Sequence, residues 1–421
     1  MSNAPAYELT GPEFRADPYP TYHHLQEHDP VYFSPELNAW LITRYKDVRE
    51  GLSHPAFSAD RVTPRVEQFP SDRRPEFDRL VSVLSQWALL RDGSEHTHLR
   101  RPVSWATRPS SIQQFRPLVE QMVDRLLRQV PVDAPFNAVA ELAVPLPLYV
   151  VGEMLGIAFD SVPMLKRCAV SIVDFFGSPP ERYLATAATA LHEIDETVAY
   201  LRDLVQHRRS DPQDDLISRM TQTLSDEAIV ANCVMMVFAA FETTTNLLGN
   251  SLKLLLDNPG QLDRLRQDPS LLSGAIEEAL RCETPVQRLS RMAVDDLELR
   301  GSHIRRGSLV FFMAGAANRD PDVFADPDTF DIARPNAARH LSFGYWTHAC
   351  PGAGLARLEA EVFLSQLLHR FPCIRGEGAP VWHENLSVRA LKTLMVSMSS
   401  GRDADDGHIP AGADALGIAG Q

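Results

Sequence analysis

Residues 340–357 read HLSFGYWTHACPGAGLAR and place one cysteine, Cys350, between a glycine-containing loop and a helical pattern. Apolar residues recur at helical spacing from Ala353 onward, so Cys350 is predicted to lie at a helix N-terminus. Unpaired N–H groups and the positive end of the helix dipole meet there and favour a thiolate. Such a thiolate is a nucleophile or a metal ligand, whereas a lone cysteine without such surroundings is most often a small buried apolar residue.

The neighbours of Cys350 narrow these alternatives. Phe343 and Gly344 precede it, His348 lies two residues upstream, and Cys-x-Gly is followed by Leu-Ala-Arg. This pattern resembles the haem-binding loop of the cytochrome P-450 family. The resemblance implies that the Cys350 thiolate is the axial ligand of the iron of haem b, with O₂ as co-substrate.

Composition describes an ordinary globular chain of 421 residues, 44% of them hydrophobic and 23% charged. The net charge of −14 argues against nucleic acid or anionic lipid as a partner, because both attract clustered lysine and arginine. The five cysteines show neither disulfide nor zinc-ribbon spacing, which indicates a reducing compartment.

The N-terminal residues have no signal-peptide pattern, and the longest apolar run, residues 228–241, is short for a membrane span. We therefore expect a cytoplasmic protein without a membrane partner, and a monomer.

The hydrophobic patterns predict a mainly α fold with small β-sheets (α+β). A surface arm is expected at residues 1–20, one large catalytic domain at 21–398, and a disordered tail at 399–421. Early in the chain the patterns predict a hairpin (31–33 with 39–43), a helix (45–52), and a long loop (55–93) with one short helix near 79–87. Pro109 and Pro117 are expected to interrupt a later helical stretch.

One helix of about thirty residues is predicted from the N-cap Ser225 to Asp257, long enough to cross a domain. Its AAFETTT segment, residues 239–245, sets Glu242 and three threonines after a strongly apolar face. The simplest interpretation is that these hydroxyls bond back to carbonyls one turn earlier. The segment also resembles the acid–alcohol signature of the P-450 distal helix, which implies that Glu242 and Thr243 relay protons.

Glu278 and Arg281 are spaced to pair on the next helix, 271–283. They resemble the Glu-x-x-Arg pair of the same family, so the three P-450 motifs occur in the family's order. The resemblance implies a P-450 fold, with haem between the long distal helix and the proximal cysteine loop.

Haem carries two anionic carboxylates that need cationic or hydrogen-bonding partners. Four residues match the family's propionate-binding positions: His96, Arg100, Arg291 and His348. His98, Arg101 and His340 are beside them but off the pattern, and we interpret them as solvated or partner-facing residues.

Two residues depart from the family pattern. Ala240 replaces a glycine beside the oxygen pocket, and Trp346 replaces a glycine in the cysteine loop, where a missing Cβ permits the turn. Three alternatives stay open for the indole of Trp346: it covers the thiolate, it projects onto a partner-docking face, or the loop is rearranged without effect.

These features predict a haem-thiolate monooxygenase that oxidises a small organic molecule, as the family implies in bacterial secondary metabolism. No Gly-x-Gly-x-x-Gly fingerprint is present, so electrons are expected from a ferredoxin or flavodoxin and its NAD(P)H-dependent reductase. The alternatives are a peroxygenase that uses H₂O₂ and a haem sensor or carrier. By family position the substrate pocket would draw on residues 61–87, 170–176, 240–241 and 286–289.

Overall fold

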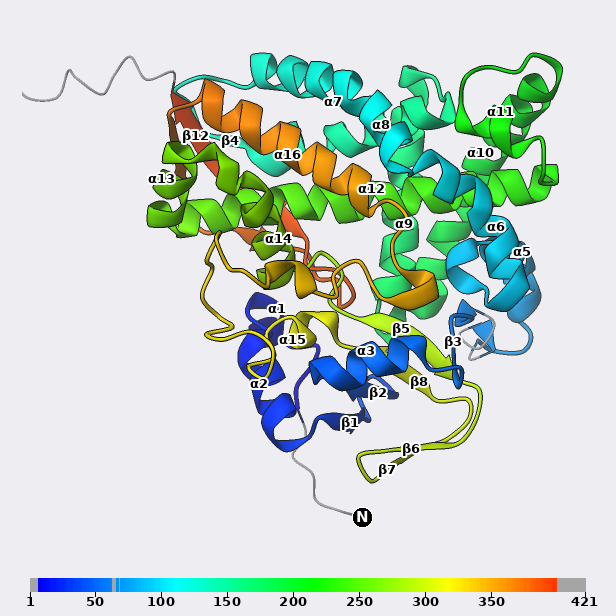
Figure 1. Cartoon of the computed structure of the whole chain (residues 1–421). Helices are drawn as coiled ribbons and strands as arrows, with labels where there is room; N and C mark the ends of the chain where they lie inside the picture. The colour runs from blue at the N-terminus through cyan, green and yellow to red at the C-terminus, as the bar shows by residue number, and fades with distance from the viewer. Residues whose placement is uncertain (1–6, 63–65, 68, 400–421) are drawn as a thin grey trace, which may run out of the picture.

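The chain is mainly helical (Figure 1), and the computed structural model describes residues 7–62, 66–67 and 69–399. The helices in these residues are α1 (Pro12–Ala16), α2 (Tyr19–His28), α3 (Tyr45–Ser53), α5 (Asp78–Leu84), α6 (Gly93–Ala106), α7 (Pro109–Gln129), α8 (Pro145–Leu155), α9 (Val162–Gly177), α10 (Tyr183–Ser210), α11 (Leu216–Met220), α12 (Asp226–Asp257), α13 (Pro259–Gln267), α14 (Leu272–Cys282), α15 (Ala314–Ala317) and α16 (Ala353–Arg370).

Short strands form four small sheets. The strands are β1 (Val31–Ser34), β2 (Ala39–Ile42), β3 (Phe57–Ser58), β4 (Phe136–Asn137), β5 (Leu289–Ala293), β6 (Leu297–Leu299), β7 (Ser302–Ile304), β8 (Leu309–Phe312), β9 (Cys373–Gly376), β10 (Val381–Trp382), β11 (Leu391–Thr393) and β12 (Met395–Ser399). The largest sheet has the order β1-β2-β8-β5-β3, in which only β2 and β8 run parallel. The predicted mainly α architecture with small sheets is confirmed.

The five-stranded sheet joins distant parts of the chain. Its hairpin β1–β2 is the predicted one, with Val31 opposite Ile42. β8 then pairs with β2, and β5 pairs with β8, so two strands from late in the chain extend the sheet from the N-terminal hairpin. Figure 1 shows this sheet with α1 and α2 in the lower part of the view and the longer helices above it.

α12 is the predicted long helix and has 32 residues. The Ser225 hydroxyl accepts a hydrogen bond from the N–H of Ala228 at 3.3 Å, which confirms the predicted N-cap. By length and composition α12 would suffice to cross a membrane. However, 67% of its most apolar 18-residue window is buried inside the fold, as in the core helix of a globular protein.

Two expectations about the first hundred and thirty residues are wrong. Pro109 does begin a helix, but α7 continues through Pro117 instead of being interrupted. Pro117 lies on the exposed side of α7, and the opposite side buries Val119, Val123 and Leu127. The free energy gained by burying these apolar side chains outweighs the cost of the one backbone hydrogen bond that proline cannot make.

The segment expected as a long loop, 55–93, also contains a strand. β3 pairs with β5, with Phe57 opposite Ala293. Two residues give too short a pattern to predict, because the strand exists only through pairing with a distant partner.

The predicted pair Glu278–Arg281 is confirmed and is fully buried, with both side chains 0% exposed. Two parallel hydrogen bonds join them, at 2.7 Å and 2.8 Å. Arg281 also donates to three backbone carbonyls, those of Asn318, Pro327 and Thr329. One guanidinium thus links α14 to the segment that leads into the cysteine loop.

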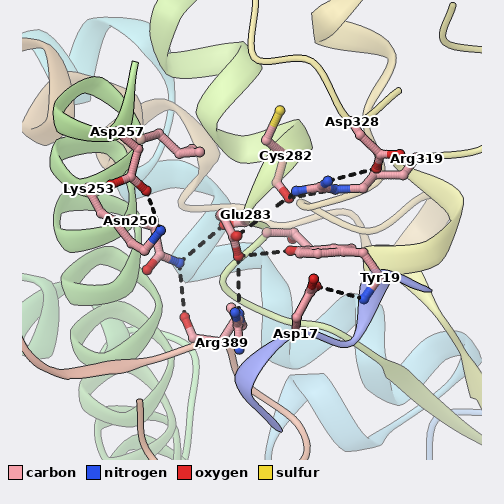
Figure 2. A network of polar contacts seen from close by, with 12 residues as sticks. Asp17, Tyr19, Asn250, Lys253, Asp257, Cys282, Glu283, Arg319, Asp328 and Arg389 are labelled. Atoms are coloured by element: carbon pink, nitrogen blue, oxygen red, sulfur yellow. Dashed lines mark hydrogen bonds and ion pairs between the residues drawn. The ribbon is translucent and has the colours of Figure 1, made fainter. Parts of the chain in front are cut away.

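A second buried network surrounds Glu283, just after α14 (Figure 2). One carboxylate oxygen of Glu283 accepts from the Tyr19 hydroxyl at 2.8 Å and from Arg389 Nε at 3.1 Å. Arg319 stacks over the Tyr19 ring at 3.4 Å, and Asn250 of α12 donates to the carbonyls of Glu283 and Arg389. The network ties α2 and the C-terminal segment to α12.

The expected surface arm, 1–20, and tail, 399–421, lie partly outside the described residues, which omit 1–6 and 400–421. Residues 7–20 contain α1 and the start of α2, and here Leu9 and Tyr19 are buried. The domain boundaries stay predictions.

Candidate active site

A cavity of about 950 Å³ is lined by the middle of α12, by the loop that carries Cys350, by α6 and by β5. All seven residues that the sequence singled out for a site line this cavity: His96, Arg100, Glu242, Thr243, Arg291, His348 and Cys350. The fold therefore brings together residues from four separate parts of the chain.

The cysteine loop presents the thiol to the cavity. The loop turns at Gly344, in the left-handed region with φ of 70°, and the N–H of Cys350 donates to the Phe343 carbonyl at 2.7 Å. α16 begins at Ala353, directly after its N-cap Gly352, as predicted.

Burial raises the pKa of the Cys350 thiol in the protein alone. The backbone N–H groups of Gly352 and Ala353, and the charges of two nearby arginines, oppose this shift without cancelling it. The helix N-terminus therefore favours the thiolate as expected, but desolvation is the larger effect until a cation binds.

Trp346 keeps the turn of this loop although it is not glycine. Its φ is 62°, in the left-handed region, which costs an L-residue about 1–2 kcal/mol. Its side chain is 64% exposed, so the indole projects into solvent and does not cover the thiol.

Two arginines border the cavity in different ways. Arg100 donates to the carbonyls of Thr347 (2.9 Å) and Ala349, and so holds the cysteine loop against α6. Arg291 is only 7% exposed, and no carboxylate of the described residues lies within 4 Å of it. Burial lowers the pKa of Arg291 to about 10. The charge of Asp92 opposes this shift without cancelling it. A buried guanidinium with no carboxylate in contact indicates a site for an anion.

Two histidines lie beside these arginines, with the rings of His96 and His348 4.2 Å apart. Burial, together with the nearby His348 and Arg100, lowers the pKa of His96 to about 4. Burial also lowers the pKa of His348, although its Nε2 lies 3.3 Å from a carboxylate oxygen of Asp92.

Sequence reasoning missed Asp92. Burial favours its neutral form, but hydrogen bonds from His348, Ser58 and the N–H of Ala59 outweigh burial and lower its pKa to about 2. The ionised carboxylate links β3 to the cysteine loop. The one available signal was its position just before the helix that carries His96.

The middle of α12 forms another part of the cavity wall, and Ala239 is exposed there within a core helix. The Thr243 hydroxyl donates to the Ala239 carbonyl one turn earlier at 2.7 Å, as the simplest interpretation predicted. Burial raises the pKa of Glu242 to about 7, although Asn246 donates a hydrogen bond to it at 3.4 Å. An acid that titrates near neutral pH and a hydroxyl thus line the same cavity.

Residues 181–386 match the family model described as Cytochrome P450. The chain is 35% identical to the cytochrome P450 monooxygenase PikC of Streptomyces venezuelae, and the match covers 94% of each chain. The chain belongs to the cytochrome P450 family. This P450 is also 33% identical to the biotin biosynthesis cytochrome P450 of Bacillus subtilis, over 86% of this chain and 91% of the relative.

Solved structures of other P450s have the same fold as this chain. A crystal structure titled P450BioI in complex with hexadec-9Z-enoic acid ligated acyl carrier protein has a TM-score of 0.85 and 32% identity, covering 92% of this chain and all of that one. The predicted P450 fold and monooxygenase class are confirmed, and the family implies haem iron and O₂ as a substrate.

The residues of the cavity fit a haem. A haem with two carboxylates would supply the anion that the buried Arg291 lacks, with Arg100, His96 and His348 beside it. The Cys350 thiol opens onto the same cavity, and coordination to a metal cation would reverse the effect of burial on its pKa. When bound, haem supplies an iron centre that activates O₂.

Replacing Arg291 with glutamine is expected to weaken haem retention. The change removes a charge-assisted hydrogen bond worth about 1.5–3 kcal/mol, so haem should be lost at least about tenfold faster. The measurement is the rate of haem transfer to apomyoglobin. Arg202→Gln, on the exposed side of α10, is the control and should leave the rate unchanged. Equal rates for both variants would remove Arg291 from the haem site.

Proposed function

We propose that this P450 uses haem b, held by Cys350, to hydroxylate a mainly apolar small molecule in bacterial secondary metabolism. A ferredoxin, or a flavodoxin, with an NAD(P)H-dependent reductase supplies the electrons in the cytoplasm. The observation that carries the proposal is the pairing of Glu242 and Thr243 in the wall of the cavity onto which Cys350 opens.

The proposed chemistry needs protons as well as electrons. One O₂, two electrons and two protons convert a C–H bond into C–OH and release one water. Glu242, with a pKa of about 7, takes up and releases protons near neutral pH. The Thr243 hydroxyl, adjacent on α12, passes them into the cavity, and Glu242 reloads it.

The lining of the cavity supports an apolar substrate. Phe176, Val173, Phe238 and Leu289 contribute to its wall from α9, α12 and β5. Several of the expected pocket positions line it, including Val286. Phe241, also expected there, does not appear in the lining and is buried at 1% exposure. Relatives named for biotin and polyketide biosynthesis support a biosynthetic role.

The two alternatives fit these residues less well. A peroxygenase receives its oxygen already reduced and protonated, and a haem sensor or carrier transfers no protons to oxygen. Neither draws net protons from solvent, whereas the monooxygenase takes up two, so an acid with a pKa near neutral beside a hydroxyl in the cavity wall suits the monooxygenase best. The first experiment is a ligand screen for spin-state shifts of the haem, because a bound substrate displaces water from the iron.

Replacing Thr243 with alanine is expected to uncouple NAD(P)H consumption from product formation. Without the hydroxyl, protons reach the oxygen by unselective routes and reducing equivalents leave as H₂O₂, while substrate binding changes little. The measurement is product formed per NAD(P)H consumed, with a fall of about tenfold or more expected from the usual size of acid–base effects.

Thr243→Ser is the matched control for this experiment. Serine keeps the hydroxyl on the same backbone position, so it should retain most of the coupling. An unchanged ratio in Thr243→Ala would assign proton delivery to another group, such as Thr244, which also lines the cavity.

A further inference from the structure

Glu359 of α16 is a buried acid to which the proposed function gives no role. The residue is 2% exposed, and its Oε2 atom has no hydrogen-bond partner within the described residues. Burying a polar group without a partner destabilises a fold, and an apolar side chain would avoid that cost. The acid therefore indicates a role other than folding stability.

The side chain of Glu359 faces the cavity that Cys350 opens onto. From α16 and its N-cap, the cavity is lined by Gly352, Leu355, Ala356 and Glu359. These positions follow the helical spacing i, i+3, i+4 and i+7, so they form one stripe along one face of α16. Glu359 is the ionisable residue of this otherwise apolar stripe.

The charged groups on the neighbouring helices are paired with one another. α16 packs against α7, α12 and α14 (Figure 1). Arg357 of α16 binds Glu277 of α14, and Glu361 of α16 binds Arg116 of α7. These pairs leave Glu359 with an apolar environment.

Burial is the only cause that shifts the pKa of Glu359, and it raises this pKa to about 8. No charged group of the described residues contributes to the shift, and this includes Glu242, the acid of α12 in the same cavity wall. At pH 7 the carboxyl of Glu359 is therefore mainly protonated and neutral. Its charge changes just above neutral pH.

About two turns of α16 separate Glu359 from the cysteine loop. Glu359 is six residues after Ala353, the first residue of α16, which is about 9 Å along the helix axis. At an effective dielectric constant of about 20, two unit charges about 10 Å apart shift each other's pKa by about one unit. A charge that appears at a metal held by Cys350 should therefore change the pKa of Glu359.

We propose that Glu359 is a redox-linked proton site, which takes up one proton when the iron held by Cys350 takes up one electron. The proposal rests on the proposed function, in which haem bound at Cys350 is reduced by single electrons. Ferric iron with a thiolate and the porphyrin dianion has no net charge, and one-electron reduction leaves one negative charge. The proton comes from solvent through the cavity and converts the Glu359 carboxylate to the neutral acid, so the added charge is balanced.

The pH range of this linkage follows from the sign of the added charge. A negative charge raises the pKa of Glu359 from about 8 to about one unit higher. Below this range Glu359 is protonated in both redox states, and above it the carboxyl is ionised in both. The reduction potential therefore falls with rising pH inside the range, where the ratio of reduced to oxidised protein at a fixed applied potential should drop about tenfold.

The test is Glu359→Gln, which is close in shape to the neutral acid but cannot ionise, so the variant should fold and bind haem. The measurement is the midpoint potential of the haem-loaded protein from about pH 6 to about pH 10, which spans the expected range. The wild type should show the fall in potential above pH 8, and Glu359→Gln should lack it.

Infrared difference spectroscopy detects the proton itself. Reduction of the wild type inside this range should produce the carbonyl stretch of a newly protonated carboxyl group, and Glu359→Gln should lack that band. The matched control is Glu361→Gln, two residues further along α16 in the half-exposed pair with Arg116, and it should keep the band and the fall in potential. Glu242→Gln should also keep both, because Glu242 titrates near pH 7 and not near pH 8.

The outcomes separate the two proposals. If the wild type shows thiolate-ligated haem and Glu359→Gln has the same pH dependence of the potential, Glu359 is not the linked site and the proposed function stands. If the wild type takes up no haem, or takes it up without thiolate ligation, both the proposed function and the linkage are wrong.

Discussion

Replacing Cys350 with histidine is expected to abolish the red-shifted Soret band of the reduced carbon monoxide complex. That band reports thiolate ligation, and Cys350 is the only cysteine of the described residues that lines the cavity. Imidazole is a neutral ligand, so the iron loses the electron density that a thiolate supplies for O–O cleavage. Monooxygenase turnover should fall to background, an effect of several orders of magnitude.

The control for this change is Cys373→Ser. Cys373 is half-buried in β9 and is not part of the cavity lining, so its variant should keep the band and the turnover. A Cys350→His protein that keeps the red-shifted band would contradict thiolate ligation by Cys350. Purified wild type that takes up no haem, even when haem is supplied, would contradict the cofactor assignment itself.

Replacing Arg281 with alanine is expected to cost about 3–5 kcal/mol of folding free energy, because it removes one partner of a fully buried ion pair. Glu278 would keep a hydrogen bond from Arg334 at 2.9 Å, and the Thr329 carbonyl would keep another from the same arginine. The carbonyls of Asn318 and Pro327 would lose the donor that Arg281 supplies. Since typical domains are stable by only about 5–15 kcal/mol, most of the protein should fail to incorporate haem or to stay soluble.

The measurement for Arg281→Ala is the denaturant midpoint together with the haem content per chain. The matched control is Arg264→Ala, which breaks the half-exposed pair with Asp331 at 3.3 Å and should cost less than about 1 kcal/mol. Arg281→Lys should fall between the two, because lysine keeps the charge but cannot make two parallel hydrogen bonds. A soluble, fully haem-loaded Arg281→Ala protein with a wild-type midpoint would rule out the structural role.

The elements predicted correctly share one property, which is that their signal is local. α12 follows from an N-cap and a long apolar pattern, and α16 follows from the spacing after Cys350. The strand β3 and the continuity of α7 through Pro117 were mispredicted because pairing with β5 and burial of the α7 face decide them. Neither partner can be read from a short window of sequence.

In the candidate site, too, some properties follow from local sequence and others depend on contacts between distant residues. Residue types and their spacing predicted the kind of chemistry: a cysteine at a helix N-terminus, an acid beside a hydroxyl on a long helix, and several cations in the family's order. The three-dimensional arrangement was needed to show that Arg291 is buried with no carboxylate in contact, that Asp92 lies within hydrogen-bond distance of His348, and that Trp346 faces solvent. The physical reason is that residue type and spacing set what a group can do. Burial, charge balance and pKa depend on neighbours that the fold brings from distant parts of the chain.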